Sequence, residues 1–325
     1  MKKALWALLC AATFLSEAWA DKVSGVNIQT TRSLTMQDAQ DALASGNYEE
    51  AFNQYHDAAV QGNNALAQFS LGLFYQNGWG RKIDPVIACR WFEQAAQGGI
   101  PVAQHLTGVC FDEGIHHPEN SVTAAHWFRK AAQAGHLYSY CHLANLLMTG
   151  RGFPKDPVKA LELCHPAAQQ GSPPAQLWMG KFYLQGDPAI RNKQEAYRWF
   201  AAAARKQAPE AFYYLGLIMQ SDSSGKHAPP EIRQMFEQAA AFKYVPAYFQ
   251  AGKHFYDAEP DPETGQLSAE HLAKAYLWLS ATIQQSQDSE EISVAKSLLQ
   301  QILAVMPETW LAELDQKIAR HLQGN

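Results

Sequence analysis

The sequence lacks the features that identify several large classes of protein. Of its 325 residues, 26 are Lys or Arg and 31 are Asp or Glu, and no basic run occurs. This mildly acidic balance excludes the electrostatic signature of a nucleic-acid-binding protein. No apolar stretch approaches the ~20 residues that a membrane-spanning helix needs, so no integral membrane segment is predicted.

Catalytic and cofactor motifs are also missing. The sequence contains no Gly-x-Ser-x-Gly element, no P-loop and no dinucleotide-binding fingerprint. His-Glu-x-x-His and Cys-x2-Cys are absent, and His116 and His117 are adjacent rather than spaced i, i+4 as helical zinc ligands are. We therefore predict a protein that is not an enzyme, with no catalytic residues, no cofactor and no metal.

The first residues, 1–20, have the pattern of a secretory signal peptide. Lys2 and Lys3 give a positive start, residues 4–15 are apolar, and Ala18 and Ala20 fill the −3 and −1 positions of a cleavage site. Removing this segment leaves 24 basic and 30 acidic residues, a net charge near −6. We predict export to the periplasm, with an uncleaved membrane anchor as the alternative.

The rest of the chain is dominated by a repeat with a period of 36 residues. Such a period indicates stacked supersecondary units. An alanine marks the first helix of each unit, at Ala67, Ala103, Ala175, Ala211 and Ala247, with Ser139 in the remaining position. A glycine follows five residues later, at Gly72, Gly108, Gly180, Gly216 and Gly252, with Ala144 once instead.

The second helix of each unit carries its own repeating residues. An alanine recurs at Ala88, Ala124, Ala160 and Ala196, and an aromatic pair follows at Trp91-Phe92, Trp127-Phe128 and Trp199-Phe200, softened to Leu163-Cys164 and Met235-Phe236. Large residues beside small ones let neighbouring helices interdigitate, so these aromatics are predicted to be core. A glycine inside a helix costs about 1 kcal/mol, and close packing of a neighbouring helix must offset it.

The repeat sets the predicted boundaries. An extended lead-in at 21–34 precedes a degenerate helix pair at 35–63, six units follow at 64–285, and two capping helices close the array at 286–325. The fold class predicted is all-α, a solenoid of stacked antiparallel helix pairs.

The motif Ala-x3-Leu-Gly-x2-Tyr-x2-Gly, followed by Ala-x2-Trp-Phe-x2-Ala-Ala, resembles the Sel-one-like repeat (SLR) family, relatives of the tetratricopeptide repeats. The resemblance covers roughly residues 67–281. It implies a right-handed α-solenoid that acts as an adaptor or scaffold, and bacterial exported members of the family are associated with envelope assembly, signalling and host interaction. The family has no shared catalytic residues.

Four cysteines remain after residue 20. Cys89 and Cys110 lie symmetrically about the turn near Gly99, and Cys141 and Cys164 do so about the loop near Gly152. Each pair can therefore face across an antiparallel helix pair, and an even count in an oxidising compartment favours disulfides. The alternative is four buried thiols, because the equivalent positions of other units hold core-like Phe and Leu.

The variable positions of the first helices are where a partner is expected to bind. Trp178 and Tyr214 stand at positions that point away from the predicted core, on the concave face of a tetratricopeptide-like solenoid. Rigid aromatic side chains beside polar groups are typical of peptide-binding anchors. The full predicted set is His142, Asn145, Trp178, Lys181, Tyr214, Leu217, Gln250 and Lys253. The alternative is that the aromatics pack against a neighbouring first helix.

Together these features predict a periplasmic scaffold that binds a protein, peptide or glycan partner. The same prediction allows a partner from the cell envelope, such as peptidoglycan. Two alternatives remain at this stage: an envelope enzyme or enzyme inhibitor acting on peptidoglycan or β-lactams, and a factor secreted beyond the outer membrane to engage a host protein.

Overall fold

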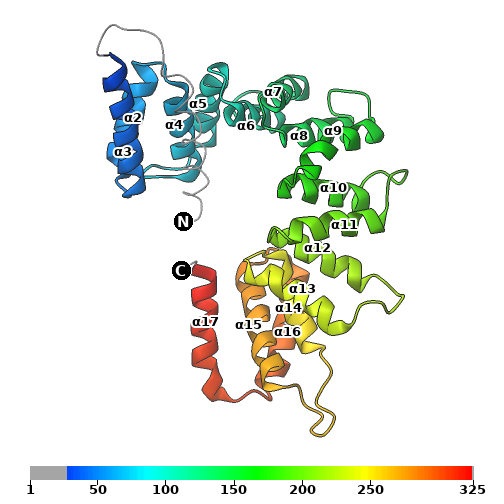
Figure 1. Ribbon diagram of the computed structural model, residues 1–325. Coiled ribbons are helices and arrows are strands. Elements are labelled where there is room, and N and C mark those ends of the chain that lie inside the picture. Colours follow the sequence, from blue (N-terminus) through cyan, green and yellow to red (C-terminus); the bar gives the residue numbers. More distant parts are fainter. Residues whose placement is uncertain (1–27, 324–325) are drawn as a thin grey trace. The chain divides into compact units, whose positions relative to one another are not determined.

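The computed structural model describes residues 28–323, and every regular element within them is a helix (Figure 1). The chain divides into two compact units, residues 1–156 and 157–325. The helices of the first unit are α2 (Ile28–Ala44), α3 (Tyr48–Val60), α4 (Ala65–Asn77), α5 (Pro85–Gln97), α6 (Pro101–Asp112), α7 (Ser121–Gln133) and α8 (Ser139–Thr149).

The second unit continues with the same kind of short helix. Its elements are α9 (Pro157–Gln169), α10 (Pro173–Gln185), α11 (Lys193–Ala204), α12 (Pro209–Gln220), α13 (Pro229–Ala241), α14 (Pro246–Tyr256), α15 (Ala269–Gln285), α16 (Ser289–Leu303), the 3-10 turn η1 (Glu308–Trp310) and α17 (Leu311–Gln323). Consecutive helices pack against each other from α2 to α8 and from α9 to α16. No helix among residues 28–323 combines the length and the apolarity needed to cross a membrane.

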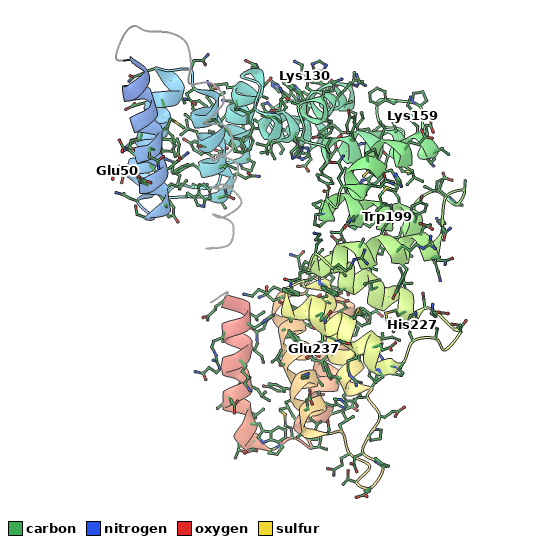
Figure 2. The ribbon with its side chains drawn as sticks, viewed as in Figure 1. Glu50, Lys130, Lys159, Trp199, His227 and Glu237 are labelled. Atoms are coloured by element: carbon green, nitrogen blue, oxygen red, sulfur yellow. A yellow bond between two sulfur atoms is a disulfide. The ribbon has the colours of Figure 1, made fainter. Side chains whose placement is uncertain are left out.

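Local sequence signals explain where the helices begin and end. The Asp84 side chain accepts a hydrogen bond from the backbone N–H of Ile87, and Pro85 occupies the first turn of α5. Gly99 has a φ of +88° in the turn that follows α5, a conformation that favours glycine. Charge follows the helix dipole in places: Glu50 lies in the first turn of α3 and Lys130 in the last turn of α7 (Figure 2).

The repeated glycines are the points where the two helices of one 36-residue repeat contact each other. At Gly216 of α12, an added Cβ would lie 2.7 Å from Cε1 of Phe236, which α13 contributes and which is fully buried. Gly108 and Gly180 have the same relation to Phe128 and Phe200, and the added Cβ would lie 2.6 Å from the ring at each. The predicted close approach is therefore present, and its partner is the aromatic ring of the second helix.

The structure corrects the predicted start of the array. Helix α2 begins at Ile28, so residues 28–34 are helical, whereas the sequence predicted an extended lead-in up to residue 34. The predicted signal peptide, residues 1–20, and residues 21–27 of the lead-in lie outside the described residues. At the other end of the chain, α17 packs on α15, and Tyr276 donates a 2.8 Å hydrogen bond to Asp315 there.

Candidate interaction surface

The predicted binding residues all lie on first helices, and none of them is fully buried. His142 and Asn145 belong to α8 of the first unit. The second unit holds the others: Trp178 and Lys181 on α10, Tyr214 and Leu217 on α12, and Gln250 and Lys253 on α14. The two groups are described separately below because they belong to different units.

In the first unit, His142 is part of a packed histidine cluster. Its ring centroid lies 4.6 Å from that of His105 on α6 and 4.9 Å from that of Phe128 on α7. The ring of His136, in the turn between α7 and α8, lies 4.5 Å from His105. His142 therefore packs against the neighbouring first helix α6, and its role in binding a partner stays a prediction.

A single hydroxyl group links two of these histidines. Ser139 Oγ lies 3.0 Å from Nδ1 of His105 and 2.8 Å from Nδ1 of His136. In the neutral cluster the hydroxyl donates to one ring nitrogen and accepts from the other. Burial, followed by the neighbouring histidines, lowers the pKa of His105 from 6.5 to about 3 and that of His142 to about 4. Burial also lowers the pKa of His136.

In the second unit, Lys181 and Tyr214 join a polar network on the helix surface. Lys181 Nζ lies 2.5 Å from Oε1 of Glu210, at the start of α12, and 5.8 Å from the centroid of the Tyr214 ring. Tyr244, in the turn between α13 and α14, donates a 3.5 Å hydrogen bond to the same Glu210 oxygen. The Glu210 carboxylate thus contacts side chains from successive repeats, and the Glu210 side chain is 24% exposed.

Neighbouring aromatic rings pack against the tyrosines of this network. The Tyr214 ring stacks on Phe200 of α11 with centroids 4.7 Å apart and planes 8° apart. Tyr213 lies beside it, with its ring centroid 5.6 Å from that of Tyr214 and 5.4 Å from that of Tyr244. Burial, with the nearby Glu210 carboxylate as the next cause, raises the pKa of Tyr244. The phenol therefore stays protonated at neutral pH and donates its hydrogen bond to Glu210.

The other predicted residues of the second unit have more local contacts. Trp178 packs its ring against Phe182 of the same helix. Leu217 packs against the apolar core that α13 to α17 share. Lys253 pairs with Asp257 one turn later. Of the predicted residues in this unit, Lys181 and Tyr214 come together, with the Lys181 ammonium over the Tyr214 ring.

The prediction missed Glu210, Tyr213 and Tyr244. Glu210 had a detectable signal, because the same position of the other units holds Leu66, Val102, Tyr138, Pro174 and Pro246, all uncharged. Tyr244 lies in a turn outside the first helices, where no periodic pattern marks it. Its contact with Glu210 joins residues 34 positions apart.

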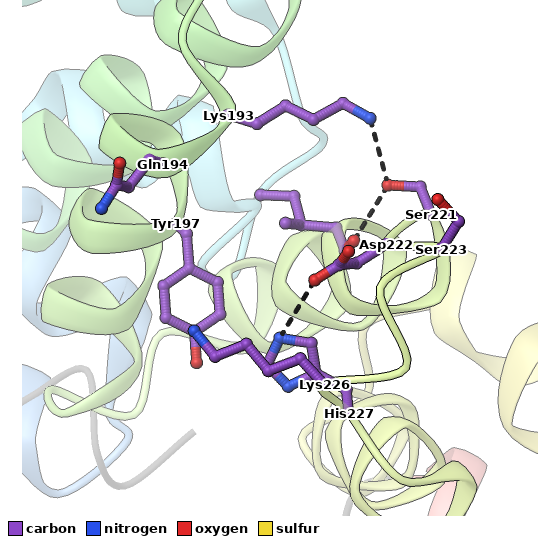
Figure 3. Close-up of a pocket in the computed structure, with 9 residues that line it drawn as sticks. Lys193, Gln194, Tyr197, Ser221, Asp222, Ser223, Lys226 and His227 are labelled. Atoms are coloured by element: carbon purple, nitrogen blue, oxygen red, sulfur yellow. Dashed lines mark hydrogen bonds and ion pairs between the residues drawn. The ribbon is translucent and has the colours of Figure 1, made fainter.

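A polar recess lies on the second unit, between the start of α11 and the loop that joins α12 to α13 (Figure 3). Its volume is about 470 Å³. Lys193 Nζ donates a 3.5 Å hydrogen bond to Ser221 Oγ, and His227 Nε2 lies 4.0 Å from an Asp222 oxygen. Most of the lining side chains are exposed and carry a polar group, and buried Ile218 adds an apolar part to the wall.

The four cysteines that the structure describes form disulfides. Cys89 of α5 and Cys110 of α6 are bonded to each other, with their Cα atoms 5.9 Å apart. This pair confirms the first of the two predicted pairings. Cys141 and Cys164 are also in disulfide linkage, and their pairing with each other stays a prediction.

Mass spectrometry checks this linkage directly. We expect the intact mass of the purified protein to rise by about 4 Da on reduction, because each of two disulfides takes up two hydrogens. Peptide mapping without reduction is expected to yield one linked peptide with Cys89 and Cys110 and another with Cys141 and Cys164. An unchanged intact mass, or a peptide that links Cys89 to Cys164, would contradict the assignment.

Comparisons with known proteins give the identity of the repeat. A family model described as the Sel1 repeat matches at residues 65–100, 101–136, 137–172 and 173–207. No curated relative matches the sequence. Four of the six predicted units are thus matched, and the all-α solenoid of antiparallel helix pairs is confirmed as the fold class.

Solved structures are similar to the chain at the level of the fold. A Sel1 repeat protein from Oxalobacter formigenes has 23% sequence identity and a TM-score of 0.63, over 77% of this chain and 100% of that one. A protective antigen with an SLR fold, present in uropathogenic Escherichia coli strains, has 22% identity and a TM-score of 0.55, over 91% of this chain and 62% of that one. At these identities, the similarity extends to the fold alone.

Proposed function

We propose that this chain, which belongs to the Sel1 repeat family, is a scaffold that binds a protein or peptide partner on the first-helix surface of its second unit. The Sel1 repeat is a fold that typically mediates protein interactions. The observation that carries the proposal is the network of Lys181, Glu210, Tyr214 and Tyr244. We infer that the protein acts by binding rather than by catalysis.

The chemistry of the network suits a peptide. Glu210 can accept hydrogen bonds from peptide N–H groups or from a basic side chain. The Lys181 ammonium has three N–H groups, so it can donate to a peptide carbonyl group while it pairs with Glu210. Stacking on Phe200 fixes the ring of Tyr214 before any partner arrives, so little side-chain entropy is lost on binding. Trp178, on the preceding first helix, offers a further large ring.

We propose the periplasm as the place where this binding occurs. Two observations support this location: the signal-peptide pattern at residues 1–20 and the disulfides formed by the four described cysteines. Disulfides persist in oxidising compartments and are rare in the reducing cytosol. The partner is accordingly a protein or peptide of the cell envelope.

Quantitative co-purification from the envelope fraction tests the surface. The variants are Lys181→Ala and Trp178→Ala/Tyr214→Ala, and each is compared with wild type by isotope-labelled mass spectrometry. We expect recovery of the specific partner to fall at least about tenfold in each variant, because truncating an anchor residue at an interface costs about 2 kcal/mol or more.

Matched controls separate binding from folding. Lys159→Ala and Tyr197→Ala change exposed side chains of the same types in the same unit, and they are expected to leave recovery unchanged. Thermal melts must show that every variant is folded. Partner recovery that stays at the wild-type level in both site variants would move the binding surface elsewhere.

A further inference from the structure

Three potential metal ligands converge in the first unit although they are separated in the sequence. Oε2 of Glu93, on α5, lies 2.9 Å from Nε2 of His116 and 3.3 Å from Nε2 of His117. All three ligand atoms lie within 4.8 Å of one another. The two histidines follow α6, so the set joins a helix to the loop after the next helix.

These separations match those of ligands around one zinc ion. Zinc binds histidine nitrogen and carboxylate oxygen at about 2.0–2.2 Å in a tetrahedron, which places neighbouring ligand atoms about 3.3–3.6 Å apart. The nitrogen–oxygen distance to His117, 3.3 Å, equals this spacing, and the distance to His116, 2.9 Å, is shorter because these two groups are hydrogen-bonded.

The surrounding structure holds the ligands in place. The Cys89–Cys110 disulfide joins α5 to α6, and Glu93 lies one helical turn after Cys89 on α5. The His117 ring stacks on Phe111, with centroids 4.8 Å apart and planes 9° apart. Fixed ligand positions of this kind reduce the cost of assembling a metal site.

Burial divides the three ligands into a fixed part and an accessible part. The His116 side chain is 1% exposed, whereas Glu93 and His117 are 26% and 45% exposed. A buried imidazole anchors the site, and the exposed side lets an ion enter and leaves room for a fourth ligand from solvent. His116 also lies within 4.8 Å of the sulfurs of Cys89 and Cys110, but these are bonded to each other and are not thiolates.

We propose that Glu93, His116 and His117 form a binding site for one zinc ion, with water in the fourth position. Two imidazole nitrogens and one carboxylate oxygen form a donor set that zinc accepts, with three protein ligands and one open position. Hard cations such as Mg²⁺ and Ca²⁺ prefer sets made of oxygen only. The open position, reached from solvent, would also accept a side chain of a partner protein.

Isothermal titration with Zn²⁺ alone tests the proposal on the full protein, stripped with a chelator and free of a histidine tag. We expect one ion bound per chain in the wild type. Glu93→Gln and His117→Ala are expected to weaken binding at least tenfold. These two residues are chosen because they are partly exposed, so that their variants retain the fold, which circular dichroism verifies.

The matched controls are Glu113→Gln and His126→Ala, which change exposed residues of the same unit. Both are expected to bind zinc as the wild type does. Protein loaded with Co²⁺ should give the intense visible absorption of tetrahedral cobalt. The proposal is overturned if the wild type binds no zinc, if the two site variants bind it as tightly as the wild type, or if the cobalt spectrum is not tetrahedral.

Discussion

Replacing Gly216 with alanine is expected to lower the free energy of unfolding of the second unit by about 2 kcal/mol, the cost of overfilling a packed core. The new methyl carbon would lie 2.7 Å from the Phe236 ring. That ring is fully buried, and it is held by His254 at 5.0 Å and Tyr213 at 5.9 Å between centroids, so it has no room to move. Urea denaturation followed by circular dichroism measures the change.

Helix propensity alone predicts the opposite sign. Alanine is favoured over glycine in a helix by about 1 kcal/mol, so an increase in stability would refute the packing argument. Phe236→Leu should relieve the overlap, and the double variant should be more stable than the sum of the two single changes by at least about 1 kcal/mol. Gln220→Ala, at an exposed position of the same helix, serves as the control and should be nearly neutral.

The sequence itself indicates the same complementarity. In the one repeat where Ala144 replaces the glycine, Cys164 replaces the phenylalanine of the second helix. A larger residue at the first position is thus matched by a smaller one at the second. The prediction that glycine permits close approach came from helix propensity, and the identity of the approaching ring required the structure.

The periodicity of the sequence predicts those features that lie within one helix or one helix pair. The alternation of small and large residues predicted the core, and the symmetry of Cys89 and Cys110 about a turn predicted their disulfide, because antiparallel helices place such residues opposite each other. The start of α2 at Ile28 was missed, since the five residues between Ile28 and Leu34 are all polar and form no apolar stripe.

The 36-residue period does not predict which side chains of different repeats contact each other. Glu93 meets His116 and His117 because a loop folds back over α5, and no spacing rule connects residues 23 and 24 positions apart. The contact between His142 and His105 is likewise unmarked by any periodic pattern. The role of His142 in binding a partner stays a prediction.

The histidine cluster makes the first unit sensitive to acid. We expect its free energy of unfolding to fall by at least about 3 kcal/mol between pH 6.5 and pH 4, since each unit of pKa shift corresponds to about 1.4 kcal/mol. The pKa values of His105 and His142 are lowered from 6.5 to about 3 and about 4 in the folded protein. Below pH 6.5 the unfolded chain therefore binds more protons than the folded one, and stability decreases as the pH falls.

The repeat supplies the substitutions that test this cause. Position 105 corresponds to Phe69 in the preceding repeat, and position 142 corresponds to Leu106, so His105→Phe/His142→Leu replaces both rings with residues that the fold already uses there. Denaturation of the double variant between pH 6.5 and pH 4 should show a much flatter decline than that of the wild type. His126→Ala removes an exposed histidine of the same unit and should decline as the wild type does. If the double variant retains the full decline, His105 and His142 are not its cause, and other groups, such as His136 or the carboxylates, are responsible.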